Sequence, residues 1–191
     1  MQLRTVVAEK DGRTRNKIKE ILSRAGFIVI GEASDSATAL TLARATQPDL
    51  VVLATNLPGL PYLELVRILD QERLAPVLVL ANYSQAEELR TIVQTSWAVS
   101  YLLKPVNELN LLPAVDLALA RFRQSQELIR EIQSLKDDLE TRKLLDQAKA
   151  MLIKYRQMTE EQAYRYIQKL AMDKRQTKAE VARAIILAFA E

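Results

Sequence analysis

The sequence predicts an α/β domain built on a doubly wound parallel sheet of five strands, followed by a long helix and a bundle of three helices. Two observations lead to this order. Short apolar runs alternate with amphipathic stretches up to Pro105, which is typical of βα units in a parallel sheet. Beyond Pro105 the apolar spacing is helical throughout, and no glycine occurs after Gly59.

Each strand of the predicted sheet is a short apolar run that ends at a turn or at polar residues. The run after Asp49 is apolar throughout, as expected for a strand whose two faces are covered by helices. The strands are expected at residues 3–8, 27–33, 49–54, 76–81 and 99–103. The helices between them are expected at residues 15–25, after a cap at Asp35, and at residues 62–70 and 85–95.

A long helix is predicted from Glu108 to Arg142, with Pro113 in its first turn. Apolar residues recur along it in two sets that do not share one register, so a local shift is expected near Gln124–Glu127. The sets are Val115, Leu119 and Phe122, then Leu128, Ile132, Leu135 and Leu139. Such a seam usually pairs with a partner helix, which predicts a homodimeric coiled coil. The alternative is a seam that packs on its own domain.

Three helices are predicted in the tail. The first continues the long helix and ends before Met158, and the second has Thr159 at its N-cap and runs to about Met172. The third begins near Thr177, where Thr177-Lys178-Ala179-Glu180 has the form of a capping box, and runs to Ala190. This third helix is mostly apolar, so it is expected to pack inside the bundle rather than to read a groove of DNA.

The composition narrows the chemistry available to the chain. Its 191 residues contain neither cysteine nor histidine, which removes disulfides, thiol nucleophiles and the usual zinc sites and fits a reducing, cytoplasmic compartment. There is no glycine-rich phosphate loop and no catalytic set, so we expect no enzyme and no cofactor. No stretch is long and apolar enough to span a membrane, and no membrane partner is expected.

Positive charge gathers at the end of the chain. Residues 142–191 contain 11 Lys or Arg against 6 Asp or Glu, whereas the rest of the chain contains 16 against 18. A basic tail on a slightly acidic front domain is compatible with a module that binds nucleic acid.

Three segments of the front domain carry recognisable motifs: Pro48-Asp49-Leu50-Val51-Val52-Leu53, Asn56-Leu57-Pro58-Gly59 and Tyr101-Leu102-Leu103-Lys104-Pro105. Residues 1–122, which contain them, resemble a response-regulator receiver domain. That family carries an acidic pair after its first strand, an aspartate after the third, a Ser or Thr after the fourth and a lysine after the fifth. The matching residues here are Glu9 with Lys10, Ala54, Ala81 and Lys104. Tyr101 matches the family's aromatic switch position, and packing at the rim is its alternative role.

These departures predict a pseudo-receiver that is neither phosphorylated nor dependent on magnesium. The methyl group of Ala54 cannot attack a phosphoryl donor, and a magnesium site would lack the carboxylate of that position. Lys10 also places a positive charge where the cation would sit. Glu9 and Lys104 are expected to form an ion pair across the site, and Asp11 is expected to be a loop or capping residue rather than to accept a phosphoryl group.

A second set of motifs lies in the last third of the chain: Asp146-Gln147-Ala148-Lys149-Ala150-Met151-Leu152, Thr159-Glu160-Glu161-Gln162-Ala163-Tyr164 and Leu170-Ala171-Met172-Asp173-Lys174-Arg175. On these motifs, residues 135–191 resemble an ANTAR domain, the helical RNA-binding module of bacterial transcription antiterminators. Small residues such as Ala148 and Ala163 are expected in its core, together with Tyr164. Tyr166 is expected to face outward, because it lies about 200° further round the helix.

RNA contacts must come from exposed groups, because Lys and Arg bind phosphates while aromatic rings stack on unpaired bases. The candidate residues are Arg142, Lys149, Lys154, Arg165, Tyr166, Lys169 and Arg175. Arg142 and Lys149 are favoured, since both fall within the ANTAR-like match. The alternative for any one of these side chains is a solvated helix face without a ligand.

The resemblance implies a dimeric antiterminator that holds paired stem-loops of a leader RNA, so that the terminator does not form and RNA polymerase reads through. Because the receiver lacks a phosphosite, we expect control by a sequestering ligand-sensor protein, as in amide- and nitrate-responsive regulators. The alternatives are a DNA-binding atypical response regulator and an adaptor that binds proteins only. A helix-turn-helix usually has a short turn that often contains glycine, which this tail lacks.

Overall fold

The computed structural model describes residues 2–96 and 98–189 of the chain. The chain divides into two compact units, Met1–Glu127 and Leu128–Glu191, and each has its own buried core. Helix α5 (Glu108–Arg156) begins in the first unit and continues in the second. Among the helices of the described residues, none is long and apolar enough to cross a membrane.

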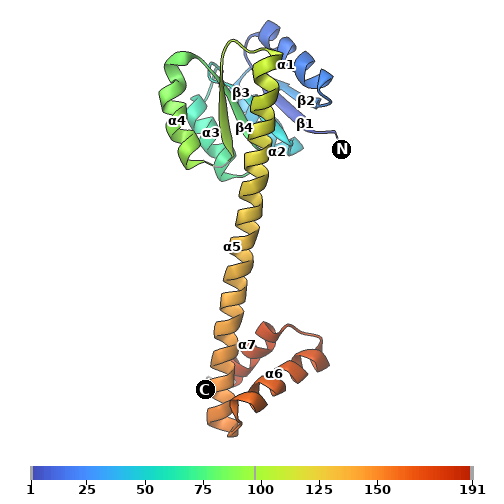
Figure 1. Ribbon diagram of the computed structural model, residues 1–191, viewed down its shortest axis with the longest axis vertical. Coiled ribbons are helices and arrows are strands. Elements are labelled where there is room, and N and C mark those ends of the chain that lie inside the picture. Colours follow the sequence, from blue (N-terminus) through green and yellow to red (C-terminus); the bar gives the residue numbers. More distant parts are fainter. Residues whose placement is uncertain (1, 97, 190–191) are drawn as a thin grey trace. The chain divides into compact units, whose positions relative to one another are not determined.

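The first unit is a parallel sheet of five strands in the order β2-β1-β3-β4-β5 (Figure 1). The strands are β1 (Arg4–Ala8), β2 (Ile28–Ala33), β3 (Leu50–Ala54), β4 (Val77–Ala81) and β5 (Val99–Leu103). Each strand lies within the range that the sequence predicts. The order reverses at β1, so the carboxyl ends of β1 and β3 mark the switch point where such sheets place their sites.

Helices cover both faces of this sheet. Helices α2 (Ser36–Thr46), α3 (Tyr62–Gln71) and α4 (Ala86–Thr95) share a core with one face, and α1 (Gly12–Arg24) and the start of α5 share a core with the other. Side chains of β3 alternate between the two cores: Val51 and Leu53 enter the first, while Leu50 and Val52 enter the second. Every residue of β3 and β4 is buried, which is why their sequences are apolar without alternation.

Capping side chains decide where two of these helices begin. Asp11 Oδ2 accepts the Thr14 N–H at 2.8 Å, and Asp35 Oδ1 accepts the Thr38 N–H at 2.8 Å. Both caps were predicted. The cap at Asp11 starts α1 at Gly12, so the predicted start at residue 15 was too late.

Two details of the helices differ from the prediction. A short 3₁₀ helix, η1 (Tyr83–Gln85), precedes α4. Helix α5 begins at Glu108 as predicted, but Pro113 is its sixth residue and therefore lies in the second turn and not in the first. The N–H that proline lacks would otherwise bond the Leu109 carbonyl, and Leu109 is 88% exposed, so water is available to that part of the backbone.

The second unit packs the end of α5 against α6 (Glu160–Lys174) and α7 (Lys178–Ala188). Its core consists of Ala148, Leu152, Ala163, Ile167, Ala171, Val181, Ala182 and Ile185. The predicted core role of the small residues is therefore confirmed at Ala148 and Ala163. Capping boxes at Thr159 and Thr177 open α6 and α7, as predicted. The predicted end of the third helix, Ala190, lies outside the described residues.

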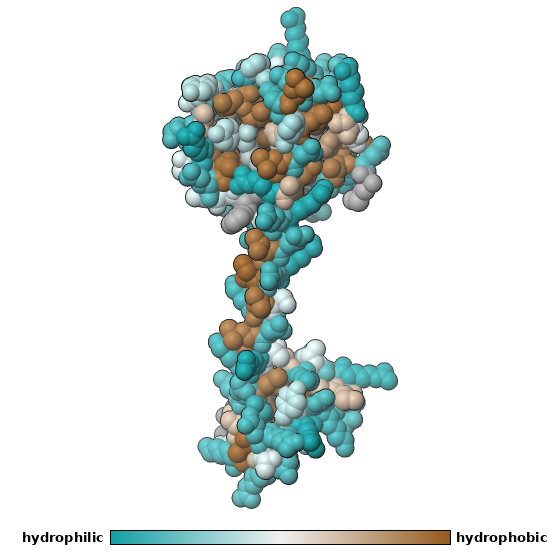
Figure 2. Space-filling view, in the orientation of Figure 1, coloured by the Kyte–Doolittle hydropathy of each residue, from teal (hydrophilic) through white to brown (hydrophobic). Residues whose placement is uncertain are grey.

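An apolar seam is exposed on α5. Leu128, Ile132, Leu135 and Leu139 are 42%, 52%, 61% and 54% exposed, and Figure 2 shows apolar side chains following one another along this helix. The seam therefore packs into neither core of its own chain. Helix α5 is unbroken through residues 124–127. The change of register expected there therefore moves the apolar residues to another face of the helix and does not interrupt its backbone.

Candidate functional site

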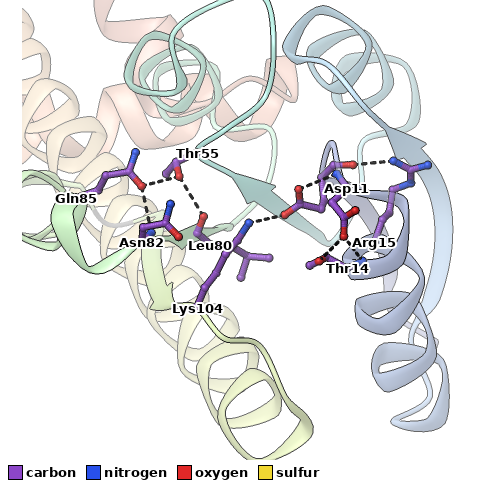
Figure 3. Close-up of polar contacts among 9 residues, drawn as sticks. Asp11, Thr14, Arg15, Thr55, Leu80, Asn82, Gln85 and Lys104 are labelled. Atoms are coloured by element: carbon purple, nitrogen blue, oxygen red, sulfur yellow. Dashed lines mark hydrogen bonds and ion pairs between the residues drawn. The ribbon is translucent and has the colours of Figure 1, made fainter.

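The carboxyl edge of the sheet holds the degenerate receiver site. Glu9 follows β1 and its side chain is fully buried, while Lys104 follows β5. Lys104 Nζ lies 2.6 Å from Glu9 Oε2, and Glu9 Oε1 accepts the Asp11 N–H at 3.0 Å. Figure 3 shows Lys104 reaching across this edge from its strand end. The predicted ion pair is thus present, and together with the Asp11 N–H it satisfies both oxygens of the buried carboxylate.

Methyl groups stand at two further strand ends of this edge. Ala54 ends β3 and Ala81 ends β4, and both are fully buried. Lys10 is exposed beside the ion pair. In the part of the chain that the structure describes, no three His, Cys, Asp or Glu side chains gather where they could hold a metal ion. The positions where the family carries its phospho-acceptor, its Ser or Thr and its lysine are therefore held by two methyl groups and by an ammonium that Glu9 neutralises.

Asp11, the remaining acid of the edge, is engaged by the helix that it caps. Its carboxylate accepts the Thr14 hydroxyl at 2.7 Å as well as the Thr14 N–H. These bonds hold the pKa of Asp11 below its ordinary value. The predicted capping role is confirmed, and both Thr14 bonds go to one carboxylate oxygen.

Side chains also fix the loop between β4 and α4. Thr55 donates its hydroxyl to Gln85 Oε1 at 2.7 Å, and the same oxygen accepts the Asn82 N–H at 3.1 Å (Figure 3). Sequence reasoning missed this contact, because no local pattern joins two residues 30 positions apart. Tyr101, at the family's switch position, is partly buried and packs against the core with Leu103.

The second unit exposes most of the predicted RNA-binding residues. Six of the seven are exposed: Arg142, Lys154, Arg165, Tyr166, Lys169 and Arg175. Tyr166 is 38% exposed, which confirms that it faces outward. Arg165 forms an ion pair with Glu161 one turn earlier on α6. Contact of these residues with RNA stays a prediction.

Lys149 differs from the other six. Its side chain is 17% exposed, and its Nζ lies 2.9 Å from Asp146 of the same helix and 2.9 Å from Glu160 at the start of α6. The bonds to Glu160 and Asp146 raise the pKa of Lys149. In the free protein this lysine therefore ties α5 to α6, in addition to any part it takes in binding RNA.

Tyr164 does not lie in the core, so its predicted position was wrong. Ala163, Ile167 and Ala171 form the core face of α6, and Tyr164, one residue after Ala163, lies about 100° round the helix and is 40% exposed. Lys178 Nζ donates to the Tyr164 hydroxyl at 3.0 Å and lies 5.1 Å from the ring centroid. This bond lowers the pKa of Tyr164.

A second aromatic contact joins the end of α5 to the end of α7. The rings of Tyr155 and Phe189 stack with centroids 5.2 Å apart and an interplanar angle of 4°. Lys154 Nζ lies 5.0 Å from the Tyr155 centroid. Lys154 is among the predicted RNA-binding residues, and Phe189 belongs to the apolar third helix that is predicted to pack in the bundle, where it contacts the core. The sequence does not predict which ring Phe189 meets.

Comparison with known proteins adds two family matches. Residues 5–116 match the response regulator receiver domain, and residues 133–186 match the ANTAR domain. The transcriptional regulatory protein PdtaR of Mycobacterium tuberculosis is 36% identical over 183 residues, which cover 96% of this chain and 89% of that protein. The nitrate regulatory protein of Klebsiella oxytoca is 49% identical over 61 residues, 32% of this chain and 15% of its own length.

Solved structures resemble the first unit. The signal receiver domain of the putative response regulator NarL from Mycobacterium tuberculosis superposes with a TM-score of 0.56 at 25% identity. The match covers 62% of this chain and 97% of that domain. The receiver fold predicted for the front of the chain is therefore confirmed.

Proposed function

The chain belongs to the response regulators that join a receiver domain to a C-terminal ANTAR domain, and on that premise we propose that it is a transcription antiterminator acting on leader RNA. The family is one of transcriptional regulators rather than enzymes. We assign residues 1–122 to a pseudo-receiver, 108–142 to the linking helix and 135–191 to the RNA-binding domain. The observation that supports RNA binding most is the ANTAR match to residues 133–186. The surface of these residues presents exposed basic side chains.

RNA binding by this domain follows from charge and shape. Arg142, Lys154, Lys169 and Arg175 are exposed, and no carboxylate of the described residues lies within ion-pairing distance of any of them. Such cations bind phosphates and release counterions. Helix α7 buries Val181, Ala182 and Ile185 in the bundle, which disfavours its use as a recognition helix for DNA.

Two copies of the domain are brought together by the seam on α5. Leu128, Ile132, Leu135 and Leu139 recur at three- and four-residue spacing and are about half exposed, as in a coiled coil without its partner. The dimer then holds two adjacent stem-loops of one leader transcript. With these stem-loops held, the terminator downstream does not form and RNA polymerase reads through.

Control of this protein does not use phosphorylation of the receiver. The third strand ends in the buried methyl group of Ala54, where the family carries its phospho-acceptor, and Lys104 is neutralised by Glu9. A partner protein that senses a ligand and sequesters the antiterminator supplies the input instead. The exposed α5 seam is a surface that such a partner can cover.

Selection of RNA by the purified full-length protein tests the function. The library consists of two adjacent hairpins with randomised loops, with excess duplex DNA as competitor, at two salt concentrations. We expect enrichment of particular loop sequences whose binding exceeds that of duplex DNA at the higher salt. Lys169→Ala should weaken binding of the selected RNA, and Lys17→Ala, an exposed lysine of α1, should not.

Other outcomes separate the alternatives. Equal and steeply salt-dependent binding of RNA and DNA, with no enrichment, would mean only phosphate electrostatics and would contradict antitermination. Tighter binding of duplex DNA would favour a DNA-binding regulator. Absence of binding to either nucleic acid would favour an adaptor that binds proteins only.

A further inference from the structure

An exposed tyrosine and a half-buried lysine from different helices of the second unit form a pair that the core does not need. Tyr164 lies on α6 and Lys178 is the first residue of α7. The core of this unit is complete without them, since α6 supplies Ala163, Ile167 and Ala171 and α7 supplies Val181, Ala182 and Ile185. An aromatic ring that is 40% exposed beside a closed core is available to a ligand.

Lys178 holds this ring in place and keeps its own charge. Its Nζ donates to the Tyr164 hydroxyl at 3.0 Å and lies 5.1 Å from the ring centroid. Across residues 2–96 and 98–189, no carboxylate lies within ion-pairing distance of this ammonium. By contrast, Lys149, Arg165 and Arg183 of the same unit are each paired with a carboxylate.

The surroundings of the ring favour an anion. Lys178 and, more weakly, Lys149 stabilise negative charge on the phenol oxygen of Tyr164. This oxygen accepts its hydrogen bond from Lys178, and within the described part of the chain no acceptor lies within hydrogen-bonding distance of the Tyr164 hydroxyl.

We propose that Tyr164 and Lys178 form a subsite for one unpaired nucleotide of the bound RNA. The ring of Tyr164 stacks on the base, and the ammonium of Lys178 binds an adjacent phosphate. Bases in a duplex stack on each other and cannot use the ring, whereas a base in a hairpin loop can. This subsite rests on the proposed RNA-binding function and adds to it the part of the RNA that is recognised.

The contrast with Tyr155 explains why the subsite lies at Tyr164. Tyr155 also has a lysine over its ring, but it is already stacked in parallel on Phe189. No aromatic ring of the described residues stacks on Tyr164. Lys149 is a positioning residue here, because its bonds to Asp146 and Glu160 fix the start of α6, and with it Tyr164, against α5.

Titrations of the full-length protein with the hairpin RNA selected above test this subsite. Tyr164→Leu removes the ring and should weaken binding about tenfold to a hundredfold, whereas Tyr164→Phe keeps the ring and should bind within a few-fold of the unaltered protein. Lys178→Met should reduce the slope of log affinity against log salt by about 0.7, the value for one phosphate of a single strand. Lys178→Arg should restore that slope.

Matched controls come from the first unit. Tyr83→Leu removes a tyrosine that is 84% exposed, and Lys17→Met removes an exposed lysine, and neither should change RNA affinity. Thermal unfolding of each variant reports on the fold, and Lys178→Arg controls for the loss of the bond from Lys178 to the Tyr164 hydroxyl in Lys178→Met.

The outcomes distinguish this subsite from the function on which it rests. If the unaltered protein selects no RNA, antitermination is wrong and the subsite falls with it. If the unaltered protein binds its selected RNA and Tyr164→Leu and Lys178→Met bind that RNA equally well, the subsite alone is refuted. Equal losses in Tyr164→Leu and Tyr164→Phe would also refute it, since they would assign the effect to the hydroxyl and not to stacking.

Discussion

Replacing Lys104 with methionine removes the ammonium that faces Glu9 and keeps a side chain of similar length. Glu9 is fully buried, and Lys104 Nζ lies 2.6 Å from its Oε2. Removing one partner of a buried ion pair costs about 3–5 kcal/mol of folding free energy, because the other charge stays without compensation. The Asp11 N–H still bonds Glu9 Oε1, and Lys104 is 22% exposed, so we expect the lower end, about 3 kcal/mol.

The reverse change should cost less. Glu9→Gln leaves the ammonium of Lys104, which is partly exposed and can be hydrated by turning toward solvent. The amide oxygen of glutamine can keep the bond from Asp11, so we expect a loss of about 1 kcal/mol. In the double variant the loss should be smaller than the sum of the single losses, because neither charge remains.

Urea unfolding of the full-length variants measures these free energies. Far-UV circular dichroism follows the unfolding of each variant. A loss below about 0.5 kcal/mol in Lys104→Met would refute the reasoning that a buried carboxylate depends on this lysine. Equal losses in Lys104→Met and Glu9→Gln would refute the asymmetry that we derive from their different burial.

Three further predictions concern the seam, the tail and the receiver edge. Leu135→Glu should convert the dimer to a monomer in analytical ultracentrifugation, while Gln133→Glu on the same helix should leave the dimer intact. A monomeric unaltered protein would contradict the coiled coil. Thr177→Ala should lower the unfolding free energy of the second unit by about 1 kcal/mol, measured by circular dichroism. Bonds from the backbone and side chain of Thr177 lower the pKa of Glu180, so the bonds that the Glu180 carboxylate accepts should stabilise fully above about pH 4.5 and be lost as the pH falls through the lowered pKa. The bond from the Glu180 N–H to the Thr177 hydroxyl remains, so the Thr177→Ala loss should shrink on acidification, and a loss that stays constant would contradict this. Intact-mass spectrometry after acetyl phosphate and magnesium should show no phosphorylated protein, because Ala54 offers no carboxylate; a phosphorylated species would overturn the pseudo-receiver.

The sequence alone determined the elements of this fold and their caps. Strand β3 reads as an apolar run because helices cover both of its faces, and Asp11, Asp35 and Thr177 signal helix starts through bonds to backbone only three residues away. These signals are local, so they do not depend on how the chain folds back on itself. The family motifs likewise pointed to a receiver fold and an ANTAR domain, which the comparisons confirm.

Only the tertiary structure decided how distant residues meet. Thr55 and Gln85 are 30 positions apart, and their contact depends on the strand order that places the end of β3 beside the end of β4. The exposure of Tyr164 also depends on contacts between helices. Helical periodicity shows which side of α6 is apolar, but a residue at the flank of that side is buried or exposed according to its neighbours. There α7 supplies the flexible side chain of Lys178, which contacts the ring and leaves part of it in water.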